Sequence, residues 1–123
     1  MNLVVAARHE SPLMRFVVEG PWRNGDALKL AYCVKAAVAR AREDHVLIDV
    51  RRVKTPPSAQ GQFLICDRLR RAMQPYVRIG LVADPELVDG DAGLPDRHHA
   101  SVAVFEAEPD ALKWLSDGAA VAP

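Results

Sequence analysis

Two short runs near the start of the chain have the hydrophobic pattern of β-strands. Residues 3–7 are continuously apolar, and residues 13–19 alternate so that Met14, Phe16 and Val18 fall on one face. The connection between the runs is short and contains a proline. The pattern predicts an antiparallel hairpin with one buried face.

The next segment has the periodicity of an amphipathic helix that ends near Arg42. Either Asn24 or Asp26 can serve as its N-cap, because both side chains accept a hydrogen bond from an unpaired backbone N–H. The apolar positions that share one arc of the helix are Leu30, Val34, Ala37, Val38 and Ala41. This pattern predicts a helix that lies on a sheet.

Strands and helices alternate along the remainder of the chain. The predicted strands cover residues 46–50, 77–82 and 101–105, and the first of these is apolar enough to be a central strand covered on both faces. A second helix is predicted to start at Ser58 and to stop before Pro75. A last helix is predicted to have Pro109 as its first residue and Gly118 as its stop.

The order of these elements is β-β-α-β-α-β-(α)-β-α, which predicts an α/β fold with a mixed sheet, a parallel core and packed helices. A chain of 123 residues is the size of one domain, here residues 1–123. The interior of this domain is expected to bring together Leu30, Ile48, Leu69, Val82 and Phe105.

Charge and composition narrow the classes of function. Sixteen basic and sixteen acidic residues cancel, so no overall field attracts nucleic acid or an anionic membrane. The apolar runs are too short to span or insert into a bilayer, and no signal peptide is present. Cys33 and Cys66 lie in predicted helices and are interpreted as free, buried thiols. We expect a cytoplasmic protein.

The strand at residues 46–50 and the ending Val104-Phe105, Ala111 and Trp114-Leu115 resemble the SpoIIAA-like group of STAS domains. That family name joins sulphate transporters and anti-sigma-factor antagonists. The resemblance implies a bacterial protein with a five-stranded mixed sheet, ordered roughly as in the sequence, and an antiparallel first strand. Many members have no assigned activity, and some carry a label that links them to lipid-binding Sec14-type domains.

The same resemblance points to Ser58 as a candidate phosphorylation site. Anti-sigma-factor antagonists are phosphorylated on a serine that starts the helix after the central strand, but here the acidic residue of that turn is missing and two prolines precede Ser58. The alternative is that Ser58 is only an N-cap. A phosphate or other anion at this helix start would lie near Arg51, Arg52 and Lys54, which form a candidate anion site; ordinary solvated charge is the alternative.

The second predicted helix has two apolar residues that do not fit its core stripe. Phe63 and Leu64 fall on or beside the polar face, next to Asp67, Arg70 and Arg71. An aromatic residue and a leucine surrounded by arginine and aspartate have the composition of a contact patch. Either this patch binds a protein, through self-association as a homodimer or with another partner, or a neighbouring loop covers it.

Catalytic and metal-binding signatures are absent from the sequence. No nucleophile elbow, phosphate-binding loop, dinucleotide fingerprint or zinc-protease motif occurs. Asp49 is expected at the C-terminal end of a parallel strand, where α/β folds tend to place ligands, but one carboxylate does not make a mechanism. We therefore expect a non-enzymatic binding or regulatory domain with no cofactor and no metal. The alternatives are a carrier of a small apolar or lipid-like ligand and an antagonist switched by phosphorylation of Ser58.

Overall fold

A computed structural model describes residues 3–10, 12–22, 25–53, 67–73, 77–83 and 102–121, with side chains in the last range described through Ser116. The strands are β1 (Val4–Glu10), β2 (Leu13–Gly20), β3 (His45–Val53), β4 (Arg78–Val82) and β5 (Val102–Phe105). The helices are α1 (Asp26–Ala41) and α3 (Glu108–Val121), and residues 67–72 are also helical.

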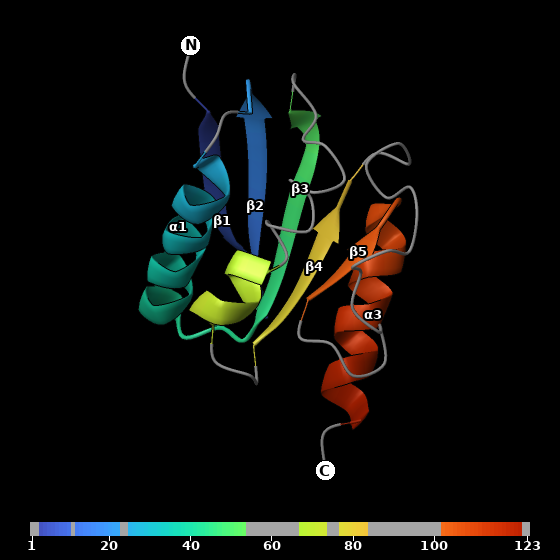
Figure 1. Ribbon diagram of the computed structural model, residues 1–123. Coiled ribbons are helices and arrows are strands. Elements are labelled where there is room, and N and C mark those ends of the chain that lie inside the picture. Colours follow the sequence, from blue (N-terminus) through green and yellow to red (C-terminus); the bar gives the residue numbers. More distant parts are fainter. Residues whose placement is uncertain are drawn as a thin grey trace.

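The five strands form one mixed sheet whose spatial order, β1-β2-β3-β4-β5, is the order of the sequence (Figure 1). β1 and β2 pair antiparallel, with Phe16 opposite Ala7. All the other neighbours pair parallel, and Ile48 at the centre of the sheet stands opposite Phe16 on one side and Leu81 on the other. The predicted fold class is therefore confirmed.

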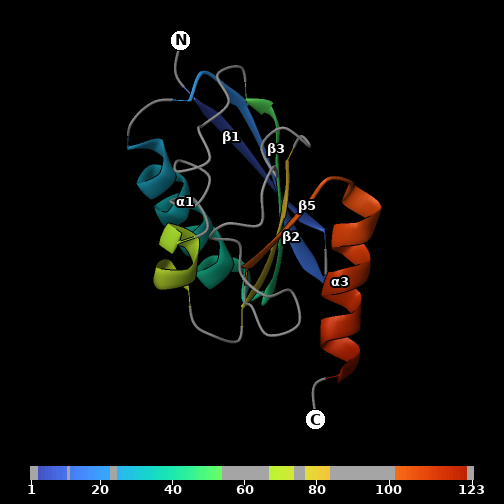
Figure 2. The same ribbon diagram turned by 45° about the vertical axis from the view of Figure 1, so that its right-hand side comes forward.

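Helices cover both faces of this sheet (Figure 2). α1 and residues 67–72 pack on one face, against a large buried cluster that contains Leu30, Ile48 and Leu69. α3 packs on the opposite face, against a smaller cluster that contains Val82 and Phe105. The expected core residues are all buried, but the prediction of one shared interior was wrong. The sheet separates two cores because successive side chains of a strand point to opposite faces.

Backbone geometry, with no side-chain bond, defines the ends of α1. Gly25 is the N-cap, with φ of 91°, and no side chain makes a capping hydrogen bond there. Asp26 is the first residue of the helix and not its cap, and Asn24 lies outside the described residues. At the other end Arg42 adopts a left-handed conformation with φ of 58° and donates its backbone N–H to the carbonyl of Val38.

α3 is longer than the sequence suggested. It begins at Glu108, which makes Pro109 its second residue, and it continues through Gly118 to Val121. Pro109 fits because the first four N–H groups of a helix have no partner within it. The prediction of a stop at Gly118 was wrong, since one glycine costs a helix only about 1 kcal/mol.

The side chain of Cys33 is exposed, which contradicts the expectation of a buried thiol, and Cys66 lies outside the described residues. Cys33 does not belong to the buried face of α1, which includes Leu30, Val34 and Val38, and its side chain therefore faces away from the core. Among the described residues no helix is both long enough and apolar enough to cross a membrane.

Candidate functional site

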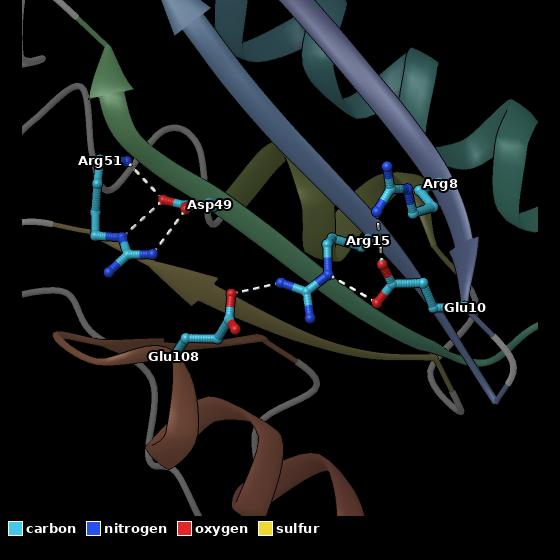
Figure 3. Close-up of polar contacts among 6 residues, drawn as sticks. All are labelled: Arg8, Glu10, Arg15, Asp49, Arg51 and Glu108. Carbon is cyan, nitrogen blue, oxygen red and sulfur yellow. Dashed lines mark hydrogen bonds and ion pairs between the residues drawn. The ribbon is translucent and has the colours of Figure 1, made fainter.

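A chain of ion pairs ties the first hairpin to the start of α3 (Figure 3). The Nε of Arg15, on β2, donates to Oε1 of Glu10 on β1 at 2.9 Å, and its Nη1 donates to Oε1 of Glu108. Arg8 lies 3.6 Å from the other oxygen of Glu10. The hydrogen bond from Arg15 holds the pKa of Glu10 below its ordinary value and in turn raises the pKa of Arg15. These partly exposed contacts connect β1 and β2 to the first turn of α3.

Asp49 is the buried acidic residue of the described core, with 7% of its surface exposed. Its Oδ1 accepts hydrogen bonds from the backbone N–H and the Nε of Arg51, at 2.9 and 3.0 Å, and its Oδ2 accepts one from Nη2 at 2.9 Å (Figure 3). Burial acts to raise the pKa of Asp49, but the hydrogen bonds from Arg51 outweigh it and hold the pKa below its ordinary value. Because β3 continues to Val53, Asp49 lies within the strand and not at the end that the sequence suggested.

Asp49→Asn is expected to lower the free energy of unfolding by about 1 kcal/mol at neutral pH, a modest value because the guanidinium of Arg51 is partly exposed. Since the folded-state pKa of Asp49 lies below the unfolded one, its contribution is complete above the ordinary value of 3.8 and is lost as pH falls through the folded value. Urea titrations at a series of pH values check this. The two proteins should converge on acidification, and a constant difference contradicts the prediction.

Both described residues of the candidate anion site, Arg51 and Arg52, bind carboxylates of this chain. Arg51 binds Asp49, and Nη1 of Arg52 donates to Oε1 of Glu19 at 3.1 Å. Lys54 and the phosphorylation candidate Ser58 lie outside the described residues. An anion at this position has to compete with Asp49 and Glu19 for the two guanidinium groups.

A groove between α1 and residues 67–72 combines apolar and basic side chains. Leu28 and Tyr32 are 44% and 61% exposed, and because they lie four residues apart on α1 they are neighbours on the helix surface. The groove has a volume of about 210 Å³, and its lining residues are Leu28, Ala31, Tyr32, Lys35, Arg68, Arg71 and Ala72. We call this feature the α1 groove.

The α1 groove includes part of the contact patch expected from the sequence. Arg71 lines it, and Nε of Arg71 lies 3.1 Å from the carboxylate of Asp67. Arg70 is exposed but is not among the lining residues. Phe63 and Leu64 lie outside the described residues.

Leu28 and Tyr32 were missed from the sequence, although a signal for them was present. They are four residues apart on one helix, and neither belongs to the arc of core positions around Leu30, Val34 and Val38. The test that singled out Phe63 and Leu64 on the second predicted helix was the search for apolar residues outside the core stripe. The same test applied to α1 identifies Leu28 and Tyr32.

The described part of the chain holds no cluster of three histidine, cysteine or acidic residues that could bind a metal ion. Arg15, Asp49 and Arg51 are each engaged in ion pairs, so the charged groups nearest the centre of the sheet stabilise the fold. The α1 groove, by contrast, is an accessible surface that carries both apolar and basic side chains.

Comparison with known proteins gives the class of fold. No family model matches the chain, and no curated protein matches it in sequence. Its structure is similar to that of an anti-sigma factor antagonist from Mycobacterium paratuberculosis, with a TM-score of 0.67, 17% identity, and coverage of 94% of this chain and 96% of that one. The fold is thus SpoIIAA-like, as the resemblance implied.

A second solved structure with the same fold carries no functional name. An uncharacterized protein with a SpoIIAA-like fold from Shewanella loihica matches with a TM-score of 0.52 and 17% identity, covering 92% of this chain and 93% of that one. At this level of identity the likeness concerns the fold alone, and a fold does not by itself determine function.

Proposed function

We propose that this protein is a non-catalytic regulatory domain that binds another protein through the α1 groove. The observation that carries the proposal is the exposure of Leu28 and Tyr32 beside the side chains of Lys35, Arg68 and Arg71. Aromatic and arginine residues are the types most enriched at protein interfaces, where apolar contacts give affinity and a charged rim selects the partner.

The charge of the groove favours an acidic partner over a second copy of this chain. A twofold symmetric dimer places the same surface of each copy against the other. Lys35 and Arg68 would then approach the basic residues of the other copy, whereas Arg71 is already paired with Asp67, and like charges brought together across an interface weaken binding. An amphipathic segment with acidic residues supplies the complementary charge and an apolar face for Leu28 and Tyr32.

The fold gives this proposal a precedent. The structure from Mycobacterium paratuberculosis is described as an anti-sigma factor antagonist, a name that implies action on another protein. We infer that the present chain uses the same scaffold in a regulatory role of that kind, without catalysis. Of the candidate patch at Phe63 and Leu64, with Asp67, Arg70 and Arg71, only Arg71 is among the residues that line the α1 groove, and Phe63 and Leu64 lie outside the described residues.

Site-specific photocrosslinking tests the proposal. A photoreactive phenylalanine analogue at Tyr32 should form an adduct with a partner in cell extract, and the charge reversal Lys35→Glu should reduce its yield about tenfold. The matched control is the same analogue at Val4, which is 59% exposed against 61% for Tyr32 but lies on β1. Mass spectrometry of the adduct should identify an acidic segment of a different protein.

Three results contradict the proposal. Equal adduct yields from Tyr32 and Val4 would mean that the groove has no preference over other exposed surface. Adducts between two copies of this chain would show self-association, the homodimer alternative, which light scattering on the purified protein would confirm. A yield that the Lys35→Glu change leaves untouched would exclude charge as a determinant of binding.

The two alternative functions have less support from the described residues. Ser58, the residue of the phosphoswitch alternative, lies outside the described residues, and Arg51 and Arg52 of the candidate anion site already bind carboxylates. A carrier of lipid-like ligands needs an apolar cavity of about 300 Å³ or more. Among the described residues the pocket of about 330 Å³ has a mixed lining of Val38, Ala39, Arg42, Glu43 and Asp44, with three charged side chains, while the apolar pocket beside α3 is about 180 Å³.

A further inference from the structure

Both walls of the α1 groove are helical, which restricts the conformation of a segment that binds there. On α1 the lining residues Leu28, Tyr32 and Lys35 have the spacing i, i+4 and i+7, so they form one stripe along the helix. The stripe spans two helical turns, about 10 Å along the axis. The facing wall consists of the helical residues 67–72. Two helices side by side form the type of groove into which a third helix packs.

A helix fits this groove better than an extended segment does. The walls are helices and not sheet edges, so an extended segment finds no strand with which to pair. Where it lay against apolar side chains, its own backbone N–H and C=O groups would lose water and gain no partner. A helix satisfies these groups internally. Polyproline segments bind grooves lined by several aromatic rings, whereas Tyr32 is the one aromatic residue among the described lining residues.

The free positive charge of the groove lies toward the C-terminal end of α1. Lys35 belongs to the second half of that helix, and residues 67–72 lie beside the same half in both views (Figure 1 and Figure 2). Within the described part of the chain neither Lys35 nor Arg68 has an ion-pair partner, whereas Arg71 already binds a carboxylate of this chain. Leu28, in the first turn of α1, makes the other end apolar. The groove therefore has a basic end and an apolar end.

This charge distribution determines the direction in which a bound helix runs. Complementarity places its acidic residues opposite Lys35 and Arg68 and its apolar residues opposite Leu28 and Tyr32. Because of the helix dipole, acidic residues stabilise a helix in its first turn and destabilise it in its last turn. A helix whose acidic turn comes first has its N-terminus beside the C-terminal half of α1. It therefore runs antiparallel to α1, and the two helix dipoles attract each other.

We propose that the segment bound in the α1 groove is an amphipathic helix antiparallel to α1, with acidic residues in its first turn and apolar residues along the next two turns. The inference rests on the protein-binding role proposed above and adds the conformation, direction and charge order of the bound segment. Its first-turn carboxylates pair with Lys35 and Arg68, and apolar residues three or four positions apart then contact Leu28 and Tyr32.

A designed peptide tests the direction of binding. The probe is a helix of about 15 residues with blocked ends, two glutamates in its first turn, and leucines three and four positions apart along one face. One version carries a nitroxide spin label at its N-terminus and another at its C-terminus. In spectra of the isotope-labelled full chain, the N-terminal label should broaden the amide signal of Lys35 more than that of Leu28. The C-terminal label should give the opposite order.

Charge reversal at one groove residue tests the position of the acidic turn. Lys35→Glu should weaken binding of the glutamate peptide about tenfold and should instead favour a peptide with lysines in place of the two glutamates. Lys29→Glu is the matched control, because Lys29 is exposed on the same helix, does not line the groove, and gives the same change in net charge. Its effect on the affinity should be less than about twofold, since exposed charges outside the contact are screened by salt.

The proposal is overturned if the two spin labels broaden the same signals or give the reverse order, because the bound helix then has no fixed direction or runs parallel to α1. It is also overturned if the peptide causes no saturable shift at Leu28 and Tyr32, or if Lys29→Glu weakens binding as much as Lys35→Glu does. The protein-binding role itself is judged by the crosslinking at Tyr32 in cell extract. Capture of an acidic segment there would support that role even where the designed helix fails, so the two proposals can fail separately.

Discussion

Phe16→Ala is expected to lower the free energy of unfolding by about 3–5 kcal/mol, enough to leave a domain of this size marginally stable. Phe16 is 1% exposed and stands on β2 between Ala7 of β1 and Ile48 of β3. Its ring contributes to the larger of the two cores, so its removal leaves a cavity that the surrounding strands cannot close. Urea unfolding followed by circular dichroism measures the loss.

Val4→Ala is the matched control for this measurement. Val4 also belongs to the hairpin but is 59% exposed, so its truncation should change the free energy of unfolding by less than about 0.5 kcal/mol. Similar losses for the two variants would mean that Phe16 is not in the core, and they would contradict the face assigned to β2.

The architecture could be predicted because each element carries its own pattern. The alternation of Met14, Phe16 and Val18 gives the buried face of β2, and all three side chains belong to the larger core. The run at residues 46–50, apolar except for Asp49, correctly indicates a strand covered on both faces, with Ile48 in one core and Leu47 in the other. These faces can be predicted because the spacing of apolar residues along one element indicates which of its faces is buried.

The errors arose where tertiary contacts decide the outcome. β3 runs three residues beyond the apolar segment, to Val53, because it gains a parallel partner in β2, where Gly20 stands opposite Val53. α3 passes through Gly118 although glycine is a poor helix former. No local pattern showed that Val82 and Phe105 lie on a different face from Leu30, since that depends on where each helix packs.

The candidate sites were even less accessible to sequence reasoning, because each is assembled from distant segments. The α1 groove joins Tyr32 to Arg68 and Arg71, and the apolar pocket beside α3 joins Leu13, His45 and Leu112. Arg15 and Glu108 are 93 positions apart in the chain. The sequence predicted a contact patch on the second helix alone, whereas the exposed apolar residues of α1 that complete the groove become evident only when both helices are placed on the sheet.

Gly80→Leu is expected to lower the free energy of unfolding by about 3 kcal/mol or more, chiefly by forcing α3 away from the sheet. Gly80 lies on β4, and a Cβ added there would stand 3.3 Å from Cβ of Ala111 and 3.7 Å from Cδ1 of Leu115. The three further carbon atoms of a leucine side chain would overlap with Ala111 and Leu115. Hydrogen exchange should show lost protection in α3 before the strands are affected, because the larger core lies on the other face of the sheet.

Two companion variants separate overpacking from a general effect of substituting this glycine. Gly80→Ala adds only the Cβ, which Ala111 can accommodate with a shift of a few tenths of an ångström, so stability should change by less than about 1 kcal/mol. Combining Gly80→Leu with Leu115→Ala makes room beside the new side chain, and the double variant should be more stable than the sum of the two single changes allows. If the effects are simply additive, α3 does not pack on Gly80 through Ala111 and Leu115, which contradicts the contacts of the smaller core.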